Sequence, residues 1–153
     1  MSIQPAVGSL QELLDERDIL RTLHRYAHTL DAGDYAGFAD CFTEDAVYGS
    51  TRNGPMATGR AELEDFAKRY QHAPAAFHKH VVVDPLINVD GDGASVRSYY
   101  FFIQDRPSGP FIASYGTYAD RLVRGADGCW RLASRTIESE AMNPDGVSAV
   151  RPR

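Results

Sequence analysis

The first third of the chain repeats its hydrophobic residues at the spacing of a helix. One apolar stripe, with intervals of three and four residues, consists of Leu20, Leu23, Ala27 and Leu30. Upstream, Ser9 and Glu12 have the spacing of a capping box, and Gly33 can supply a left-handed stop. We therefore predict a helix that runs from this capping box to about Asp31.

Two shorter helices are predicted after it. Asp34 can cap the second helix, and the third begins near Gly59. Their apolar positions at helical spacing are Tyr35, Phe38, Ala39 and Phe42 in the second, and Leu63, Phe66, Ala67 and Tyr70 in the third. Between the two helices, residues 46–49 predict a short strand, and a second short strand is an option after the following loop.

From Phe77 onward the pattern is typical of strands rich in β-branched and aromatic residues. The segments are "FHKHVVVDPLINV", "ASVRSYYFFIQD", "FIASYGTYADRLVR" and "CWRLASRTIES". The turn sequences "DGDG", "RPSGP" and "GADG" separate them, so an antiparallel meander is expected. Helices followed by strands predict one α+β domain over residues 1–153, with the helices on one sheet face and residues 1–8 and 140–153 as tails.

Composition narrows the range of functions. The chain is 43% hydrophobic and 24% charged, with a net charge of -5, as in an ordinary globular protein. There is no basic stripe, no secretion signal and no membrane-spanning run, so we expect a cytoplasmic protein without nucleic-acid or membrane partners. Cys41 and Cys129 do not form a disulfide framework, and Cys41 lies among apolar residues as a core side chain would. Without a phosphate loop, nucleophile elbow or dinucleotide fingerprint, no organic cofactor is predicted.

Two polar residues break the apolar pattern. Asp31 lies one turn beyond Ala27, where burial and the helix C-terminus both disfavour a negative charge unless cations or donors compensate it. It is either a solvent-facing residue at the helix end or a functional carboxylate. Strand alternation puts His78 and His80 on one face and Lys79 on the other. His80 is then either a core histidine with one hydrogen bond or a general base that a carboxylate orients.

The other histidines and the aromatic residues leave alternatives open. His78 and His80 lack a third ligand at motif spacing, so no metal site is predicted, and His24 and His28 are interpreted as helix-surface or packing residues. The dense aromatic residues could form sheet core or a cavity wall, and they are Tyr48, Tyr99, Tyr100, Phe101, Phe102, Tyr115 and Tyr118. Arg135 would bind an anionic or electron-rich substrate group if it pointed inward.

Three segments together resemble the SnoaL-like branch of the nuclear transport factor 2-like superfamily. They are "ERDILRTLHRYAHTLDAGDYAGFADCFTEDAVY", "KHVVVDPLINVDGDGASVRSYYFF" and "YGTYADRLVRGADGCWRLASRTI", which run from Glu16 to Ile137. The resemblance implies a cone-shaped α+β barrel in which a strongly curved, mostly antiparallel sheet and three N-terminal helices enclose an apolar pocket. It also implies a homo-oligomer, a dimer or a trimer. Relatives include scytalone dehydratase, lindane dehydrochlorinase, polyketide cyclases and the small subunits of ring-hydroxylating dioxygenases.

The resemblance also assigns residues. Asp31 and His80 fall on the aspartate–histidine dyad that removes a proton from carbon in the dehydratase and the dehydrochlorinase. Tyr48 is similar to a substrate-polarising tyrosine, and Arg135 to a pocket arginine. The dehydratase's second histidine is missing from "YYFFIQD", and Tyr26 stands near the dehydrochlorinase lysine, so only the dyad carries over.

The expected function is therefore that of a cofactor-independent lyase or isomerase, dehydratase- or cyclase-like, acting on a small, largely apolar substrate. His80, Asp31 and Tyr48 would be catalytic, and the substrate would contact Tyr26, Tyr100, Phe102, Tyr115 and Arg135. The alternative is a non-catalytic role, either as the small subunit of a ring-hydroxylating dioxygenase or as a small-molecule-binding module.

Overall fold

A computed structural model describes residues 9–146 of the chain and shows helices packed on a single sheet. The elements are α1 (Leu10–Ala32), α2 (Tyr35–Asp40), β1 (Phe42–Ser50), β2 (Gly54–Thr58), α3 (Gly59–Lys68), β3 (His78–Asp90), β4 (Gly93–Gln104), β5 (Phe111–Arg124) and β6 (Trp130–Met142). No helix among these residues is long and apolar enough to cross a membrane.

The helix caps that the sequence predicts for α1 and α2 are present in the structure. The Ser9 hydroxyl accepts the Glu12 amide at 3.2 Å, and the Glu12 carboxylate accepts the Ser9 amide at 2.9 Å. Gly33 ends α1 with φ of 74°, a conformation that only glycine adopts without strain. The Asp34 side chain caps α2. The predicted ends of α1 and the predicted start of α2 are therefore confirmed. Phe42, predicted in the second helix, instead begins β1, and Tyr70 lies beyond the end of α3.

The strands form one curved sheet in the order β2-β1-β6-β5-β4-β3. β3 to β6 make the predicted antiparallel meander, and β1 joins β6 in parallel. The predicted α+β class is confirmed, and the barrel is an open one, because β2 and β3 remain as two edges. β6 continues to Met142, three residues into the segment predicted as a C-terminal tail, because Ala141 and Met142 pair with β5.

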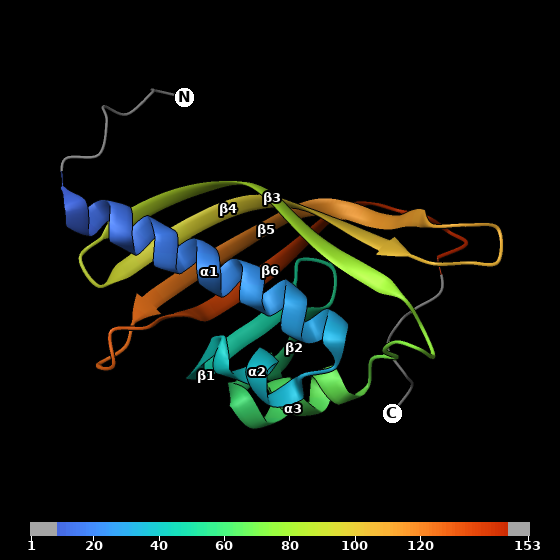
Figure 1. Cartoon of the computed structure of the whole chain (residues 1–153), viewed down its shortest axis with the longest axis horizontal. Helices are drawn as coiled ribbons and strands as arrows, with labels where there is room; N and C mark the ends of the chain where they lie inside the picture. Colours follow the sequence, from blue (N-terminus) through green and yellow to red (C-terminus); the bar gives the residue numbers. More distant parts are fainter. Residues whose placement is uncertain (1–8, 147–153) are drawn as a thin grey trace.

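α1 crosses one face of the sheet, while α2 and α3 gather beside β1 and β2 (Figure 1). Near the start of α1, Asp15 accepts two hydrogen bonds from Arg124 on β5, at 2.7 and 2.9 Å, and one from the Trp130 indole at 3.3 Å. Asp15 is only 5% exposed. A buried carboxylate therefore fixes the first half of the helix to β5 and β6.

The cysteines have different environments. Cys41 is buried, and this burial raises the pKa of its thiol to about 11. Cys129 is exposed, and both thiols are free. The burial of Cys41 confirms the prediction that it is a core residue. A thiol with a raised pKa is also a poor nucleophile near neutral pH.

A fully buried ion pair joins β5 to β6 in the centre of the core. Arg135 donates from Nε and Nη2 to the two oxygens of Asp120, at 2.8 and 2.7 Å, and neither side chain is exposed. The guanidinium lies between the rings of Tyr26 and Tyr118, 4.0 and 4.1 Å from their centroids. These contacts compensate a charge that would otherwise be costly to bury.

The Asp120→Ala substitution is predicted to lower the free energy of unfolding by about 3–5 kcal/mol, because it strands the Arg135 charge in the core. Urea denaturation measures this loss. The control is Glu138→Ala, which breaks the more exposed Arg97–Glu138 pair on the same sheet and should cost about 0–1 kcal/mol. Equal losses in both variants would contradict the assignment.

Candidate active site

The last turn of α1 meets the first residues of β3 through one carboxylate. Asp31 Oδ1 lies 2.7 Å from Nδ1 of His80, 49 residues further along the chain. The backbone amide of His80 also donates to both Asp31 oxygens, at 3.2 and 3.1 Å. Each of the two side chains is 7% exposed. Asp31 therefore fixes both the position of the strand and the orientation of the imidazole.

This contact determines which nitrogen of His80 can act as a base. An ionised carboxylate only accepts hydrogen bonds, so the nitrogen facing Asp31 must carry the proton. In the neutral imidazole, Nε2 then keeps its lone pair, and no residue within 9–146 is hydrogen-bonded to it. The arrangement matches the requirement for a general base whose charge a carboxylate stabilises after proton transfer.

Aromatic rings surround the His80 imidazole. Phe102 on β4 stacks on it with a centroid separation of 4.6 Å. Tyr26 from α1 and Tyr70 approach edge-on, at 6.4 and 6.1 Å. This apolar surrounding limits the access of water and strengthens the electrostatic interaction between Asp31 and His80.

Tyr26 and Tyr48 form a buried pair of hydroxyl groups. Their oxygens are 3.1 Å apart, and the two side chains are 0% and 1% exposed. Burial raises the pKa of Tyr48 well above its ordinary value, so this hydroxyl remains protonated and can donate. The structure thus places Tyr26 beside His80, whereas Tyr48 reaches the dyad indirectly, through the hydroxyl of Tyr26 and through the rings of Phe66 and Tyr70.

Arg135 points inward and pairs with a carboxylate of the protein itself. The structure pairs it with Asp120 in the core, beneath the ring of Tyr26, and its Nη1 has no hydrogen-bond partner. Asp120 was not among the residues predicted from the sequence, although alternation along β5 puts it on the inward face with Tyr118 and Leu122. A carboxylate between two apolar inward positions is the signal that could have identified it.

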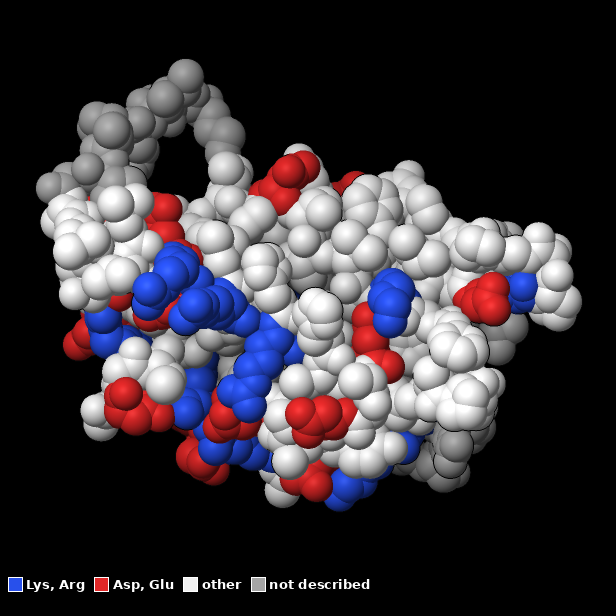
Figure 2. Space-filling view, viewed as in Figure 1, with Lys and Arg blue, Asp and Glu red and all other residues white. Residues whose placement is uncertain are grey.

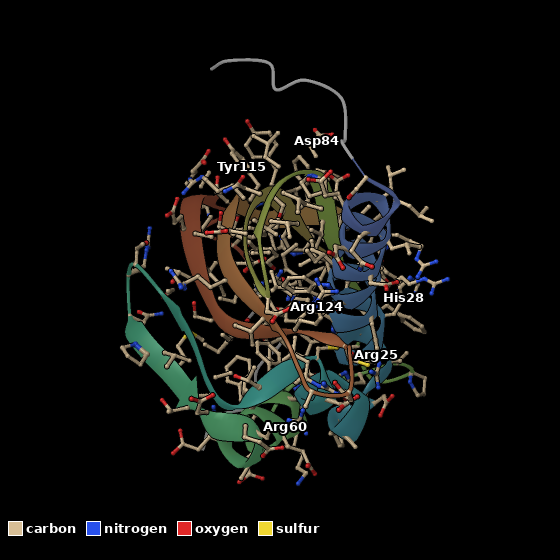
Figure 3. All side chains as sticks on the ribbon, turned by 90° about the vertical axis from the view of Figure 1, so that its left-hand side faces the viewer. Arg25, His28, Arg60, Asp84, Tyr115 and Arg124 are labelled. Carbon is tan, nitrogen blue, oxygen red and sulfur yellow. The ribbon has the colours of Figure 1, made fainter. Side chains whose placement is uncertain are left out.

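Tyr100 and Tyr115 have opposite environments. Tyr100 is buried, stacks on Tyr118 at 4.6 Å and bonds the Ser139 hydroxyl at 2.9 Å. Tyr115 is 44% exposed and lies on the outer side of the sheet (Figure 3). Tyr115, which was expected to contact the substrate, thus lies on the opposite face of the sheet from the inward residues of β5. The inward positions of β5 include Gly116 and Tyr118, and a register shift follows Tyr115 in its pairing with β6.

His78 is a neighbour of the dyad that the sequence analysis placed on the same strand face but gave no role. Its side chain is 1% exposed, and its Nε2 lies 3.6 Å from Asp31 Oδ1. Burial, together with the neighbouring His80, lowers the pKa of His78 to about 4, so it is neutral near pH 7. Asp31, His78 and His80 are the described residues whose ligand atoms, all within 4.8 Å of one another, could hold a metal ion.

A surface hollow of about 500 Å³ between α1 and β3 reaches the dyad. It is lined by His24, Ala27, His28, Asp31, Ala32, Ala73, Phe77, Lys79, His80, Val81 and Val82. His24 and His28 are exposed residues of α1, which confirms their interpretation as surface residues. Figure 3 shows His28 on the side of α1 that faces away from the sheet.

A second hollow, of about 340 Å³, has a different character and does not include the dyad. Its basic residues are Arg17, Arg21, Arg25 and Arg131, and basic side chains gather along this side of α1 in Figure 2. Asp18 and Asp40 pair with all of them. These arginines therefore form a surface ion-pair network.

Comparison with known proteins agrees with this architecture. The SnoaL-like domain model matches residues 11–136. The chain belongs to the SnoaL-like domain family. No curated protein matches the chain in sequence. The family model identifies the SnoaL-like domain, and solved structures include a similar dehydratase-type protein.

Three solved structures are similar over most of this SnoaL-like chain. Rv3472 of Mycobacterium tuberculosis, a protein of unknown function, is 31% identical over 94% of this chain and 83% of its own, with a TM-score of 0.79. A putative scytalone dehydratase from Novosphingobium aromaticivorans is 26% identical over 92% and 94%, with a TM-score of 0.73. A Catenulispora acidiphila protein in complex with S-DNPA is 26% identical over 84% and 95%, with a TM-score of 0.72.

Removal of the Asp31 carboxylate is predicted to destabilise the fold. Asp31→Ala leaves the His80 amide without its acceptor and should lower the free energy of unfolding by about 1–3 kcal/mol. Asp31→Asn keeps one acceptor oxygen and should cost less. Asp18→Ala, a control on the same helix, breaks only surface ion pairs and should cost about 0–1 kcal/mol in urea denaturation. An Asp31→Ala loss no larger than that of Asp18→Ala would contradict this role.

Proposed function

We propose that the protein is a cofactor-independent lyase or isomerase in which His80 removes a proton from carbon. The observation that supports this most is the 2.7 Å contact between Asp31 and His80, both nearly excluded from solvent. A histidine held by a carboxylate in this way is oriented in one tautomer, and its imidazolium form is stabilised. The similarity to a putative scytalone dehydratase is consistent with an elimination reaction.

The first step follows from the orientation of the imidazole. His80 Nε2 takes a proton from a carbon next to a carbonyl, and the electron pair of the broken C–H bond moves into an enolate. Asp31 stabilises the resulting imidazolium through Nδ1–H. In a dehydratase, the enolate expels the hydroxyl group on the neighbouring carbon, which takes up a proton and leaves as water. In an isomerase, the enolate regains the imidazolium proton at another carbon. In a cyclase, the enolate carbon attacks a second carbonyl carbon of the substrate, and the oxygen of that carbonyl takes up the proton.

The tyrosine pair is the proposed source of the second proton. Tyr26 lies edge-on to His80 and shares a hydrogen bond with Tyr48. A hydroxyl here can donate to the developing enolate oxygen or to a leaving hydroxyl group, and Tyr48 orients it. Arg135 packs beneath the Tyr26 ring and holds this tyrosine in position beside His80.

The substrate class follows from the surfaces around the dyad. Phe102 stacks on His80, and the hollow between α1 and β3 includes Phe77, Val81 and Val82. These side chains favour a small, largely apolar molecule. The solved relative in complex with S-DNPA is consistent with a small-molecule ligand in this fold.

Deuterium exchange tests the proposed base directly. In deuterated water, with a panel of small ketones and hydroxyketones, the wild-type chain should place deuterium on the carbon next to the carbonyl, as mass spectrometry detects. His80→Ala should lose about 10²–10⁴-fold in rate, because a positioned base contributes that factor. The Asp65→Ala control changes an exposed residue of α3 that is not part of the hollow between α1 and β3 and should keep the wild-type rate. Undiminished exchange in folded His80→Ala would rule out the base role.

We also propose that the chain forms a homo-oligomer through the outer face of its sheet. Val83, Tyr99, Phe101 and Tyr115 are cross-strand neighbours on β3, β4 and β5. Tyr99 is 56% and Tyr115 44% exposed, so this face presents aromatic surface to solvent. A second copy of the same face would cover it symmetrically.

Charge introduced on this face should dissociate the oligomer. The double variant Tyr99→Lys, Tyr115→Lys places lysines across the contact. Size-exclusion chromatography with light scattering should give it the mass of a monomer, 16.9 kDa. Leu13→Lys alters an apolar residue of α1 that is 53% exposed and should leave the wild-type mass unchanged. A double variant with the wild-type oligomeric mass would locate the contact elsewhere, and a monomeric wild type would disprove the oligomer.

A further inference from the structure

Asp31, His78 and His80 form a compact set of metal-ligating side chains at the junction of α1 and β3. One ligand atom from each lies within 4.8 Å of the other two. Their side chains are 7%, 1% and 7% exposed. We propose that these three residues bind one divalent transition-metal ion of the zinc class, in competition with the proton shared by Asp31 and His80.

The strongest support is the incomplete bonding of His78. Both of its ring nitrogens are buried, and neither has a hydrogen-bond partner. A buried polar atom without a partner is costly, and in native structures it calls for an explanation such as a missing ion. Its Nε2 lies 3.6 Å from Asp31 Oδ1, so a ligand that bridged the two would satisfy it.

The distances suit a zinc-type ion. Zinc holds nitrogen and oxygen ligands at about 2.0–2.2 Å, which places neighbouring ligand atoms of a tetrahedron about 3.4 Å apart. The 3.6 Å between His78 and Asp31 already fits. The 2.7 Å between Asp31 and His80 must widen by about 0.7 Å as the ion replaces the shared proton.

The donor set also selects the class of metal. Two imidazoles and one carboxylate suit zinc and its transition-metal neighbours, whereas calcium and magnesium prefer sites made of oxygens. Three protein ligands leave a fourth tetrahedral position for water or a bound molecule.

An ion can reach the site from outside. The hollow between α1 and β3 includes both Asp31 and His80. Lys79 Nζ lies 4.0 Å from Asp31 Oδ2, but this side chain is 71% exposed and can move into solvent. Lys79 therefore weakens the attraction of a cation without closing the entrance.

Binding would occupy the groups that the proposed reaction uses. With an ion on His80 Nδ1 and Asp31, the carboxylate no longer holds the proton that fixes the imidazole, so zinc should inhibit deuterium exchange. That inhibition rests on the proposed function, whereas the binding itself does not. Zinc binding without any exchange activity in the metal-free chain would leave the metal site standing and remove the proposed function.

Equilibrium dialysis with zinc chloride tests the site. The full chain without an affinity tag, stripped with a chelator, should take up one equivalent of zinc. His78→Gln and His80→Gln should each weaken binding by at least about 10-fold, because each removes a ligand. The matched controls His24→Gln and His28→Gln make the same change at exposed histidines beside the same hollow and should bind as the wild type does. No uptake, or equal affinity in all four variants, would overturn the proposal.

A measurement on the wild type guards against variants that fail to fold. X-ray absorption at the zinc edge of the loaded chain should show a shell of nitrogen and oxygen atoms with outer scattering from two imidazoles. Scattering from one imidazole or from none would overturn the proposal, whatever the variants do.

Discussion

The hydrogen bond between Asp31 and His80 is the interaction on which both the site and the position of α1 depend. It brings together two residues 49 positions apart, at 2.7 Å and nearly out of contact with solvent. The same carboxylate accepts the backbone amide of His80, so the strand and the imidazole are fixed by one side chain. The tautomer of His80 is thus set by a contact that also holds the helix on the sheet.

The other buried charges make this site possible. Asp15 fixes the start of α1 to Arg124 and Trp130, as Asp31 fixes its end to β3. In the centre, the Arg135–Asp120 pair is compensated internally and supports the ring of Tyr26 from beneath. Because these carboxylates accept hydrogen bonds from fixed donors, the helix, the sheet and the tyrosine pair keep one arrangement around His80.

Local signals predicted most of the fold, and long-range contacts had to come from the structure. Ser9, Glu12 and Gly33 marked the ends of α1, because capping depends on residues a few positions apart. The Asp31–His80 contact could be anticipated only through family resemblance, since periodicity left both residues with two interpretations. The alternation of β5 indicates that Asp120 faces inward, but it could not show that Arg135 is its partner within the core.

The tautomer of His80 is the most direct test of the central claim, and ¹⁵N NMR of the imidazole nitrogens measures it in the neutral, metal-free chain. The account predicts a protonated Nδ1, held by Asp31, and an unprotonated Nε2. In Asp31→Asn this preference should be lost or reversed. A wild-type His80 with its proton on Nε2 would contradict the account, because the nitrogen assigned as the base would then have no lone pair.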